Sequence, residues 1–423
     1  MLTGIPQCPK NVGNNKERDK IMIADKMRPL VENNSAIRAM FEEGKKMAAV
    51  YGRENVYDFS LGNPNVPAPP AVNQAILDII REEETTLIHG YMSNAGFEET
   101  RAAVAQSLNR RFGTHFRLEN ILMTVGAASG MNVILKTILD PGDEVLVFAP
   151  YFMEYGSYVR NYDGVLAVVP PDQSSFQPDL EEFEKRITPK TKAVIINTPN
   201  NPTGVVYSAE TLHKIAAILL KKEEELGIQI LLISDEPYRE LAYDGIEVPY
   251  VTPFYHNTVV CYSYSKSLSL PGERIGYLVI PDEVEDSGKV IAAAAIANRV
   301  LGCVNAPSLM QRVIVRCVDE QVNLEAYNRN RELLYGSLKE YGFECIKPEG
   351  AFYLFVKAPA DDKEFCQACK AHRVLLVPGT SFACPGYVRI AYCVSYEQIQ
   401  RSLPAFKQIA EEYGLTGKRE EKQ

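Results

Sequence analysis

Tryptophan is absent from this chain of 423 residues, and histidine occurs only five times. The histidines are widely separated and lack the paired spacing that brings ligands to a metal ion, so we predict no metal site. The longest run of small apolar residues, Val290–Ala297, is far too short to span a bilayer, and Met1–Lys20 has no apolar core like that of a secretory signal. The sequence therefore predicts no membrane association and a cytoplasmic location.

The chain also has fewer basic than acidic residues. The 45 lysine and arginine residues are outnumbered by 54 aspartate and glutamate residues, and no basic stripe interleaved with aromatics occurs. We therefore expect no nucleic-acid partner. The nine cysteines, spread from Cys8 to Cys393, are an odd number in a chain without an export signal, which predicts free thiols. Cys366 and Cys369 have the spacing of a redox or zinc pair, but without a second pair they indicate two cysteines one turn apart on a helix that packs inward.

The segment Ser263–Arg274 carries the most informative chemistry. Its hydroxyl-rich turn holds Lys266, whose amine can form a Schiff base with a carbonyl. Ser263, Ser265 and the forked guanidinium of Arg274 can bind a phosphate. Together these residues indicate a site for an aldehyde that carries a phosphate. An ordinary lysine in a polar surface loop is the alternative interpretation of the segment.

Two further segments place polar side chains after buried strands. Asn197–Gly204, rich in amides and prolines, follows the apolar run Ala193–Ile196. Asp235 and Tyr238 follow a second apolar run, Ile230–Ile233. In open α/β sheets, ligands bind at the carboxyl ends of the strands. The sequence therefore predicts that these ends and the lysine-bearing segment converge on one crevice.

The order of apolar and amphipathic segments predicts the fold class, which is α/β. Between residues 120 and 280, short apolar runs alternate with amphipathic stretches, which favours a mostly parallel sheet sandwiched by helices. A long helical stretch begins near Glu283, is broken near Gly302–Pro307 and resumes through Tyr341. The remainder is typical of a smaller α+β domain. Its expected strands are Gly342–Ile346, Ala351–Val356, Val374–Val377 and Tyr387–Ala391, and its expected helices are Asp361–Ala371 and Tyr396–Tyr413.

In this order, and at separations of 34 and 31 residues, Asn201, Asp235 and Lys266 resemble the site of fold-type I pyridoxal-5′-phosphate (PLP) enzymes. The resemblance is to the class I and II aminotransferases, of the aspartate aminotransferase type, and runs from about Asp58 to the C-terminal helix. Its other matching segments are Ser60–Pro64, Tyr91 with Gly96 and Arg101, Val125–Ala128, Pro150–Phe152 and Val388–Ile390. It implies a large PLP-binding domain at 62–300 and a discontinuous small domain made of 1–61 and 301–423.

The resemblance also implies catalytic roles. Lys266 would form the Schiff base with PLP and, once freed by an incoming amino acid, would move the substrate's α-proton. Asp235 would face the pyridine nitrogen and keep it protonated. Tyr238 and Asn201 would donate hydrogen bonds to the ring oxygen O3′. Two other interpretations stay open, because Asp235 could cap a helix N-terminus and Tyr238 could belong to the core.

The phosphate is expected at the turn formed by Gly126, Ala127 and Ala128, where backbone N–H groups at a helix N-terminus form an anion site. Many relatives have a hydroxyl side chain in this turn, and this sequence has none at 127 or 128, so the contacts there would come from the backbone alone. The side chains that would complete the phosphate site are Ser263, Ser265, Arg274 and Tyr91. By resemblance, Tyr91 comes from the neighbouring subunit, which makes a homodimer part of the expected site.

The substrate contacts follow from the same resemblance. Phe152 would stack on the PLP ring, where several relatives have tryptophan, although it could be an ordinary core residue. Arg389, in an otherwise apolar strand, would bind the substrate α-carboxylate, with Gly62 and Asn201 beside it. A structural salt bridge is the alternative for this arginine. A dicarboxylate substrate would need a second cation for its distal carboxylate, and Arg299 is the nearest candidate. Its position in the sequence is offset by about one residue from the corresponding position in aspartate aminotransferases.

The implied activity is that of an amino-acid aminotransferase with ping-pong chemistry. An amino acid gives its amino group to PLP and leaves as a 2-oxo acid, and a second 2-oxo acid then takes the group. Aspartate with 2-oxoglutarate is the first expectation, followed by alanine or aromatic donors. The same fold also serves C–S lyases and other β-eliminating or decarboxylating enzymes, so these stay open.

Two further implications can be checked against a structure. A PLP-binding regulatory domain, the alternative without catalysis, would carry an N-terminal helix-turn-helix, and the residues before Gly62 are too few and not basic enough for one. In relatives, the prolines at positions 150 and 202 follow cis peptide bonds. We therefore expect Ala149–Pro150 and Asn201–Pro202 to be cis.

Overall fold

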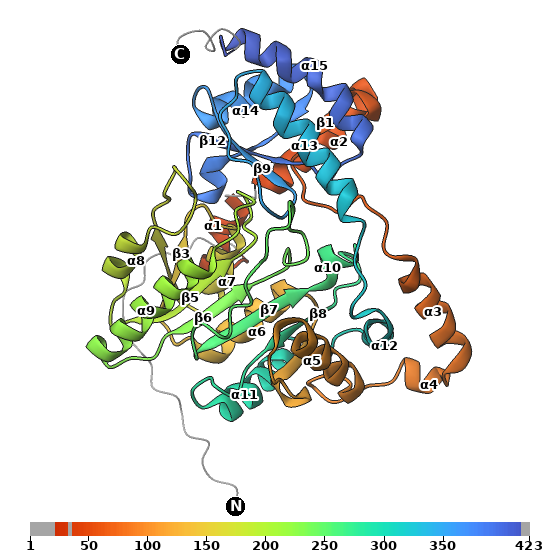
Figure 1. Cartoon of the computed structure of the whole chain (residues 1–423), viewed down its shortest axis with the longest axis vertical. Helices are drawn as coiled ribbons and strands as arrows, with labels where there is room; N and C mark the ends of the chain where they lie inside the picture. Colours follow the sequence, from red (N-terminus) through yellow and green to blue (C-terminus); the bar gives the residue numbers. More distant parts are fainter. Residues whose placement is uncertain (1–21, 33–35, 416–423) are drawn as a thin grey trace, which may run out of the picture.

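A seven-stranded sheet forms the centre of the fold. The computed structural model describes residues 22–32 and 36–415, and the strands follow the order β2-β8-β7-β6-β5-β3-β4 (Figure 1). These strands are β2 (Ile121–Thr124), β3 (Glu144–Phe148), β4 (Val165–Val169), β5 (Thr191–Asn197), β6 (Leu231–Asp235), β7 (Thr258–Ser263) and β8 (Gly276–Val279). β8 is antiparallel to β2 and β7, and the other neighbours are parallel. The predicted mostly parallel sheet is confirmed.

Helices cover both faces of this sheet because successive strand residues point to opposite sides. On β3, Val145 and Val147 pack toward α6, α7 and α11, whereas Leu146 and Phe148 pack toward α8 and α9. Burial on both faces explains why the strands are continuous apolar runs. The helices of this part are α3 (Pro70–Glu82), α4 (Thr85–Ile88), α5 (Glu98–Phe112), α6 (Ala127–Ile138), α7 (Glu154–Asn161), α8 (Leu180–Arg186), α9 (Ala209–Leu226), α10 (Tyr264–Ser267), α11 (Ser287–Val300) and α12 (Ser308–Cys317).

A smaller antiparallel sheet lies at the C-terminal end of the chain. Its order is β11-β12-β9, formed by β9 (Tyr353–Lys357), β11 (Val377–Pro378) and β12 (Tyr387–Ala391). Its helices are α13 (Leu324–Glu340), α14 (Asp362–Ala371) and α15 (Tyr396–Glu412). The segment with α2 (Ala36–Tyr51) joins this part, because α2 contacts β11 and β1 (Tyr57–Asp58) pairs in parallel with β10 (Val374–Leu375); α1 (Arg28–Glu32) precedes this segment. Figure 1 shows the red β1 and α2 beside the blue C-terminal elements.

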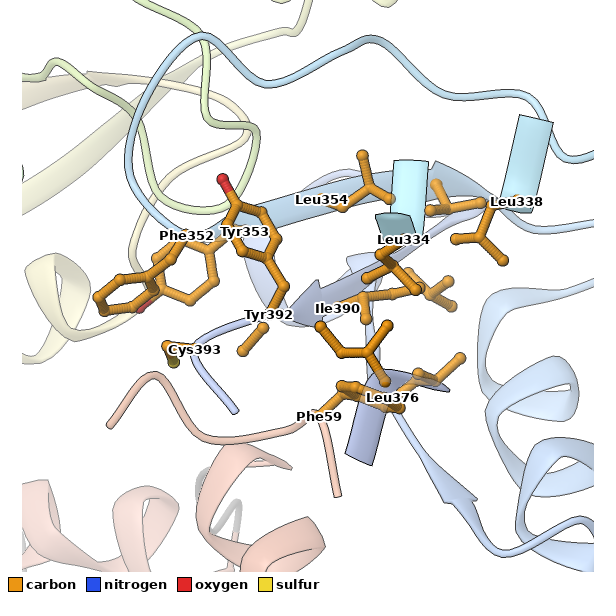
Figure 2. Close-up of a cluster of buried hydrophobic side chains, with 14 of the residues drawn as sticks. Phe59, Leu334, Leu338, Phe352, Tyr353, Leu354, Leu376, Ile390, Tyr392 and Cys393 are labelled. Atoms are coloured by element: carbon orange, nitrogen blue, oxygen red, sulfur yellow. The ribbon is translucent and has the colours of Figure 1, made fainter. Parts of the chain in front are cut away.

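Phe59, directly after β1, ties the N-terminal segment into the core of the smaller sheet. Figure 2 shows its ring beside Leu376 and below Ile390, and all three side chains are buried. The Phe59 carbonyl also accepts a hydrogen bond from Ala391 N at 2.9 Å. Segments more than three hundred residues apart therefore share one hydrophobic core.

Two sequence predictions about the C-terminal part are wrong in detail. Gly342–Ile346 is not a strand, because within it only Cys345 forms a bridge, to Val356 of β9. Gly342 has a positive φ of 93° and Pro348 has no N–H to donate, so the segment runs beside β9 for only a short distance. The long helical stretch after α11 contains a second break at residues 318–323, which separates α12 from α13.

Other details agree with the sequence analysis. Ala149–Pro150 and Asn201–Pro202 are cis, as predicted, and Thr198–Pro199 is a third cis bond. Cys366 and Cys369 are buried free thiols on α14, also as predicted. Within residues 22–32 and 36–415, no helix is both long and apolar enough to cross a membrane. The predictions made for Met1–Lys20 and Cys8 lie outside the described residues.

Candidate active site

The last residues of β5, β6 and β7, which are Asn197, Asp235 and Ser263, line a cavity of about 290 Å³. Loop and strand residues of the C-terminal part close its other side. The predicted site residues that line this cavity are Gly62, Ala127, Ala128, Phe152, Asn201, Asp235, Tyr238, Ser263, Ser265, Lys266, Arg274 and Arg389. The structure therefore brings most of the predicted site together at the carboxyl edge of the parallel strands.

Lys266 lies on α10, directly after β7. Its Nζ donates a hydrogen bond to the Gly62 carbonyl at 2.6 Å and lies 5.2 Å from the centre of the Phe352 ring. Desolvation lowers the pKa of this amine to about 8, and the positive charges of Arg389 and Arg274 lower it further. A lysine with a lowered pKa is more often neutral near physiological pH, and the neutral amine is the nucleophile and base.

Asp235, at the end of β6, is buried with one oxygen satisfied and one unsatisfied. Tyr155 of α7 donates a hydrogen bond to its Oδ2 at 2.5 Å, whereas Oδ1 has no partner within the described ranges. Burial raises the pKa of Asp235 to about 7; the Tyr155 bond opposes this rise, and the nearby charge of Glu236 adds to it. Because an unpaired buried carboxylate oxygen is costly, Oδ1 needs a donor, preferably a cationic one.

Tyr155 is a site residue that the sequence argument missed. It lies one turn beyond Phe152, and the centroids of the two rings are 5.7 Å apart in an edge-to-face arrangement. This spacing at the start of a helix places both side chains toward the cavity, which they line. Helical spacing from Phe152 could therefore have identified Tyr155.

Tyr238 and Asn201 reach the cavity from the turns after β6 and β5. The Tyr238 hydroxyl is 2.8 Å from that of Tyr353, a β9 residue that the sequence argument also missed. The N–H of Asn201 donates to Asn197 Oδ1 at 2.8 Å, and its own Oδ1 accepts from Arg389 Nη1 at 3.0 Å. Tyr238 also belongs to the hydrophobic core, so both interpretations of this residue describe part of its surroundings.

The N-terminus of α6 and the α10 segment form a cup of hydrogen-bond donors. The hydroxyls of Ser263 and Ser265 are 2.7 Å apart, and Arg274 Nη1 donates to Ser265 Oγ at 3.3 Å. Gly126 has a positive φ of 83°, and a Cβ there would come within 2.7 Å of Arg274 Nη2. A side chain at 126 would therefore displace the guanidinium. A helix N-terminus, two hydroxyls and a guanidinium are groups that bind phosphate.

Arg389, on β12, is a buried cation. Its Nη1 and Nη2 donate to Asn201 Oδ1 at 3.0 Å and to the Ser60 carbonyl at 2.5 Å, and its Nε has no partner within the described ranges. The rings of Tyr353 and Phe382 lie 4.5 and 4.9 Å from the guanidinium carbon. Burial lowers the pKa of Arg389. None of its contacts within the described ranges is a carboxylate, so the salt bridge left open by the sequence is not found there.

Tyr91 and Arg299 do not line the cavity of their own chain. The Tyr91 side chain is 94% exposed, and Arg299 is exposed in the last turn of α11. The two segments nevertheless meet, because Asn298, next to Arg299, donates to the Asn94 carbonyl at 3.5 Å. The segments that carry these two predicted site residues are therefore in contact at the surface of the molecule.

The donor set of the cavity fits PLP, the cofactor that the resemblance implies. The cup around Arg274 suits the phosphate, and the unpaired Oδ1 of Asp235 suits a protonated ring nitrogen. Lys266 provides an amine of lowered pKa on the same cavity. In the part of the chain that the structure describes, no cluster of three or more histidine, cysteine, aspartate or glutamate residues could hold a metal ion.

Comparisons with known proteins show the family of this chain. The family model described as aminotransferase class I and II matches residues 54–406. The chain is 31% identical over 370 residues to an aspartate aminotransferase of Thermotoga maritima, covering 86% of this chain and 94% of that protein. An amino transferase from Eubacterium rectale superposes with a TM-score of 0.91 and 50% identity, covering 93% and 99% of the two chains. Thermus thermophilus aspartate aminotransferase with maleate gives a TM-score of 0.79 at 29% identity, covering 89% and 96%.

Proposed function

Because this chain belongs to the class I and II aminotransferases, we propose that its cavity transfers amino groups from aspartate to 2-oxoglutarate. The family moves an amino group between an amino acid and a 2-oxo acid with PLP, and that is the reaction of this chain. The observation that carries the proposal is Arg389, a buried cation facing the same cavity as Lys266. Aspartate is supported by the Thermotoga relative's name and by maleate, a dicarboxylate, in the Thermus structure.

In the proposed site the cofactor is held at both ends. Ser263, Ser265, Arg274 and the α6 N-terminus would bind its phosphate, and Asp235 Oδ1 would accept from its ring nitrogen. Tyr155 keeps Asp235 oriented through the 2.5 Å bond to Oδ2. When bound, PLP supplies an electron-withdrawing ring that takes up the negative charge left on the substrate's α-carbon as its proton departs.

Lys266 and Arg389 act on the substrate. Arg389 binds the α-carboxylate, with Asn201 and Gly62 beside it, which fixes the α-carbon relative to Lys266. The neutral Nζ of Lys266 would then take the α-proton, after which water releases the 2-oxo acid, and a second 2-oxo acid takes up the amino group in the reverse sequence. Desolvation, which lowers the pKa of this amine, favours the neutral form that the first step requires.

We propose further that the enzyme is a homodimer in which Tyr91 reaches the phosphate site of the neighbouring subunit. Its support is that Tyr91 is 94% exposed and that Ile296 and Val300, one turn apart on α11, are both more than half exposed. Large exposed apolar side chains grouped in this way mark interaction surfaces. Arg299 lies on the same face, so the same dimer would carry it toward the neighbouring cavity.

A mixed dimer tests this arrangement. Lys266→Ala and Tyr91→Ala subunits, each with its own affinity tag, are expressed together and the mixed species is purified. If Tyr91 serves the partner, the mixed dimer keeps one intact site and recovers about half of wild-type activity per dimer, although each parent is weak. If Tyr91 serves its own chain, the mixed dimer recovers no activity, and the cross-subunit proposal is wrong.

The choice of donor is tested at Arg299. The purified enzyme is assayed with all amino acids against 2-oxoglutarate and pyruvate, and Arg299→Ala is compared with wild type. We expect Arg299→Ala to weaken aspartate and glutamate by about 1–3 kcal/mol in kcat/KM while alanine and aromatic donors are spared. Arg299→Lys should restore part of the loss, since it returns the charge without the planar fork. Equal losses for neutral and acidic donors would make Arg299 structural.

The same assay bears on the remaining proposals about activity. A wild-type enzyme that prefers neutral donors would overturn the aspartate assignment. Release of pyruvate and ammonia from a β-substituted amino acid, without net transfer, would indicate a lyase instead. The division of the chain at residues 62 and 300 also stays a proposal, supported by the β1 and β10 pairing. A cytoplasmic location stays a prediction from the sequence.

A further inference from the structure

Tyr353, the first residue of β9, contacts three site residues at once. Its hydroxyl lies 2.8 Å from the Tyr238 hydroxyl, and its ring lies 4.5 Å from the guanidinium carbon of Arg389. A Cβ built on Gly62 would overlap the Tyr353 hydroxyl, so the two residues pack directly together. Figure 2 shows this hydroxyl projecting away from the apolar cluster that holds the ring. Tyr353 therefore links the cofactor side of the cavity to the substrate side.

Either hydroxyl of the Tyr238 and Tyr353 pair can donate to the other, so the direction of this hydrogen bond depends on what else Tyr238 contacts. A tyrosine hydroxyl has a single hydrogen to donate. If Tyr238 donates into the cavity, the hydrogen between the two hydroxyls has to come from Tyr353. Burial raises the pKa of Tyr353 to about 12, so the group keeps its proton at neutral pH and can donate it. A hydroxyl that accepts one hydrogen bond becomes a stronger donor in the next, so Tyr353 strengthens the donation by Tyr238.

The ring contact limits the movement of Arg389. Tyr353 and Phe382 lie 4.5 and 4.9 Å from its guanidinium carbon, and Asn201 and Ser60 accept hydrogen bonds from its two terminal nitrogens. β9 and β12 are paired in the same sheet, so the backbones that carry Tyr353 and Arg389 are also fixed relative to one another. The arginine is therefore held in one orientation before a substrate arrives.

We propose that Tyr353 is a positioning residue that directs the Tyr238 hydroxyl toward the cofactor with its own hydroxyl and supports Arg389 with its ring. The inference rests on the proposed roles of Tyr238 and Arg389. The two functions are separable, because Tyr353→Phe removes the hydroxyl and keeps the ring, whereas Tyr353→Leu removes both. Asp235 and Arg389 are the charged groups that face Tyr238, and both are retained in both variants.

The role of the Tyr353 hydroxyl is tested by absorbance titration of the PLP-loaded enzyme. The visible absorbance of bound PLP changes when the Schiff base with Lys266 gains or loses its proton, and the midpoint of that change is measured. Tyr238→Phe should raise the midpoint pH by removing the donor itself. Tyr353→Phe should raise it in the same direction by less, about half a pH unit, because it weakens that donor without removing it. Tyr392→Phe is the matched control. Tyr392 is equally buried in the same cluster, and its hydroxyl donates to the Ala351 carbonyl at 3.2 Å and lies beside Tyr243 rather than Tyr238, so its removal should leave the midpoint unchanged.

The outcomes separate this inference from the proposed function. A midpoint that moves in Tyr238→Phe but is the same in Tyr353→Phe as in wild type would overturn the inference alone. A midpoint that moves in neither would overturn the role of Tyr238 and, with it, the inference. Equal shifts in Tyr353→Phe and Tyr392→Phe would show a general effect of loosening the core, and would also overturn it.

The ring is tested by substrate binding in the first half-reaction. With the amino acid that serves the wild-type enzyme best, Tyr353→Phe should change the apparent Kd by less than about twofold, because the ring remains under Arg389. Tyr353→Leu should raise it by about 5- to 30-fold. Equal affinities in the two variants would show that the ring gives Arg389 no support, and would overturn that half of the inference. The Tyr353→Phe titration decides the other half even if the leucine variant folds poorly.

Discussion

Lys266→Ala is expected to bind PLP and to lose nearly all turnover, with a rate lower by at least about 10²–10⁴-fold. The loss is large because the same Nζ both anchors the cofactor and moves the α-proton in the proposed site, and no other lysine of residues 22–32 and 36–415 lines the cavity. The phosphate cup and Asp235 are untouched, so binding persists. Steady-state kinetics and absorbance of the purified variant measure the two effects separately.

The control for this prediction is Lys289→Ala, which removes an exposed lysine on α11 that pairs with Asp286 at 2.9 Å. Turnover should stay at the wild-type value. Borohydride reduction of the wild-type enzyme, followed by peptide mapping, should place the pyridoxyl group on Lys266. A label on another lysine, or full turnover by Lys266→Ala, would show that the assignment of this residue is wrong.

Arg389→Ala is expected to lower kcat/KM for every amino-acid donor by about 2–5 kcal/mol. All donors share the α-carboxylate, and this arginine is the buried cation that faces Lys266 across the cavity. The effect should therefore be independent of the side chain, unlike that of Arg299→Ala. Arg389→Lys should recover only part of the loss, because lysine cannot form two parallel hydrogen bonds with a carboxylate.

Measurement requires at least one acidic and one neutral donor with both arginine variants. Apoenzyme unfolding midpoints provide the control for folding, because a variant that is merely unstable would lose activity and stability together. A loss confined to aspartate and glutamate in Arg389→Ala would contradict the proposed role. It would show that Arg389 reads the distal carboxylate, and that another group binds the α-carboxylate.

Much of the fold and of the candidate site could be predicted because their signals are local. The apolar runs at β5 and β6 predict buried strands, and the polar residues after them predict where the crevice lies. The segments around Asn201, Asp235 and Lys266 are enough to indicate the family, and the family is confirmed. Each of these features depends on residues that are close together in the sequence.

What could not be predicted depends on distant residues. Tyr353 is 115 positions from Tyr238, and nothing around either tyrosine in the sequence shows that their hydroxyls meet. The short bridge at Cys345 looks like a strand in the sequence, since alternation does not reveal how far the pairing extends. The role proposed for Arg299 is similar in kind, because it would depend on a second copy of the chain.

The residues that line the cavity come from two different sheets and the segments next to them. Asp235 and the cup of donors around Arg274 lie beside the ends of strands in the seven-stranded sheet, whereas Gly62, Tyr353 and Arg389 come from segments of the smaller sheet and its N-terminal connection. Engineering of substrate preference can therefore keep Tyr353 and Arg389 and concentrate on the exposed face of α11 around Arg299. A library restricted to those positions would vary the amino acid accepted while leaving the cofactor seat intact.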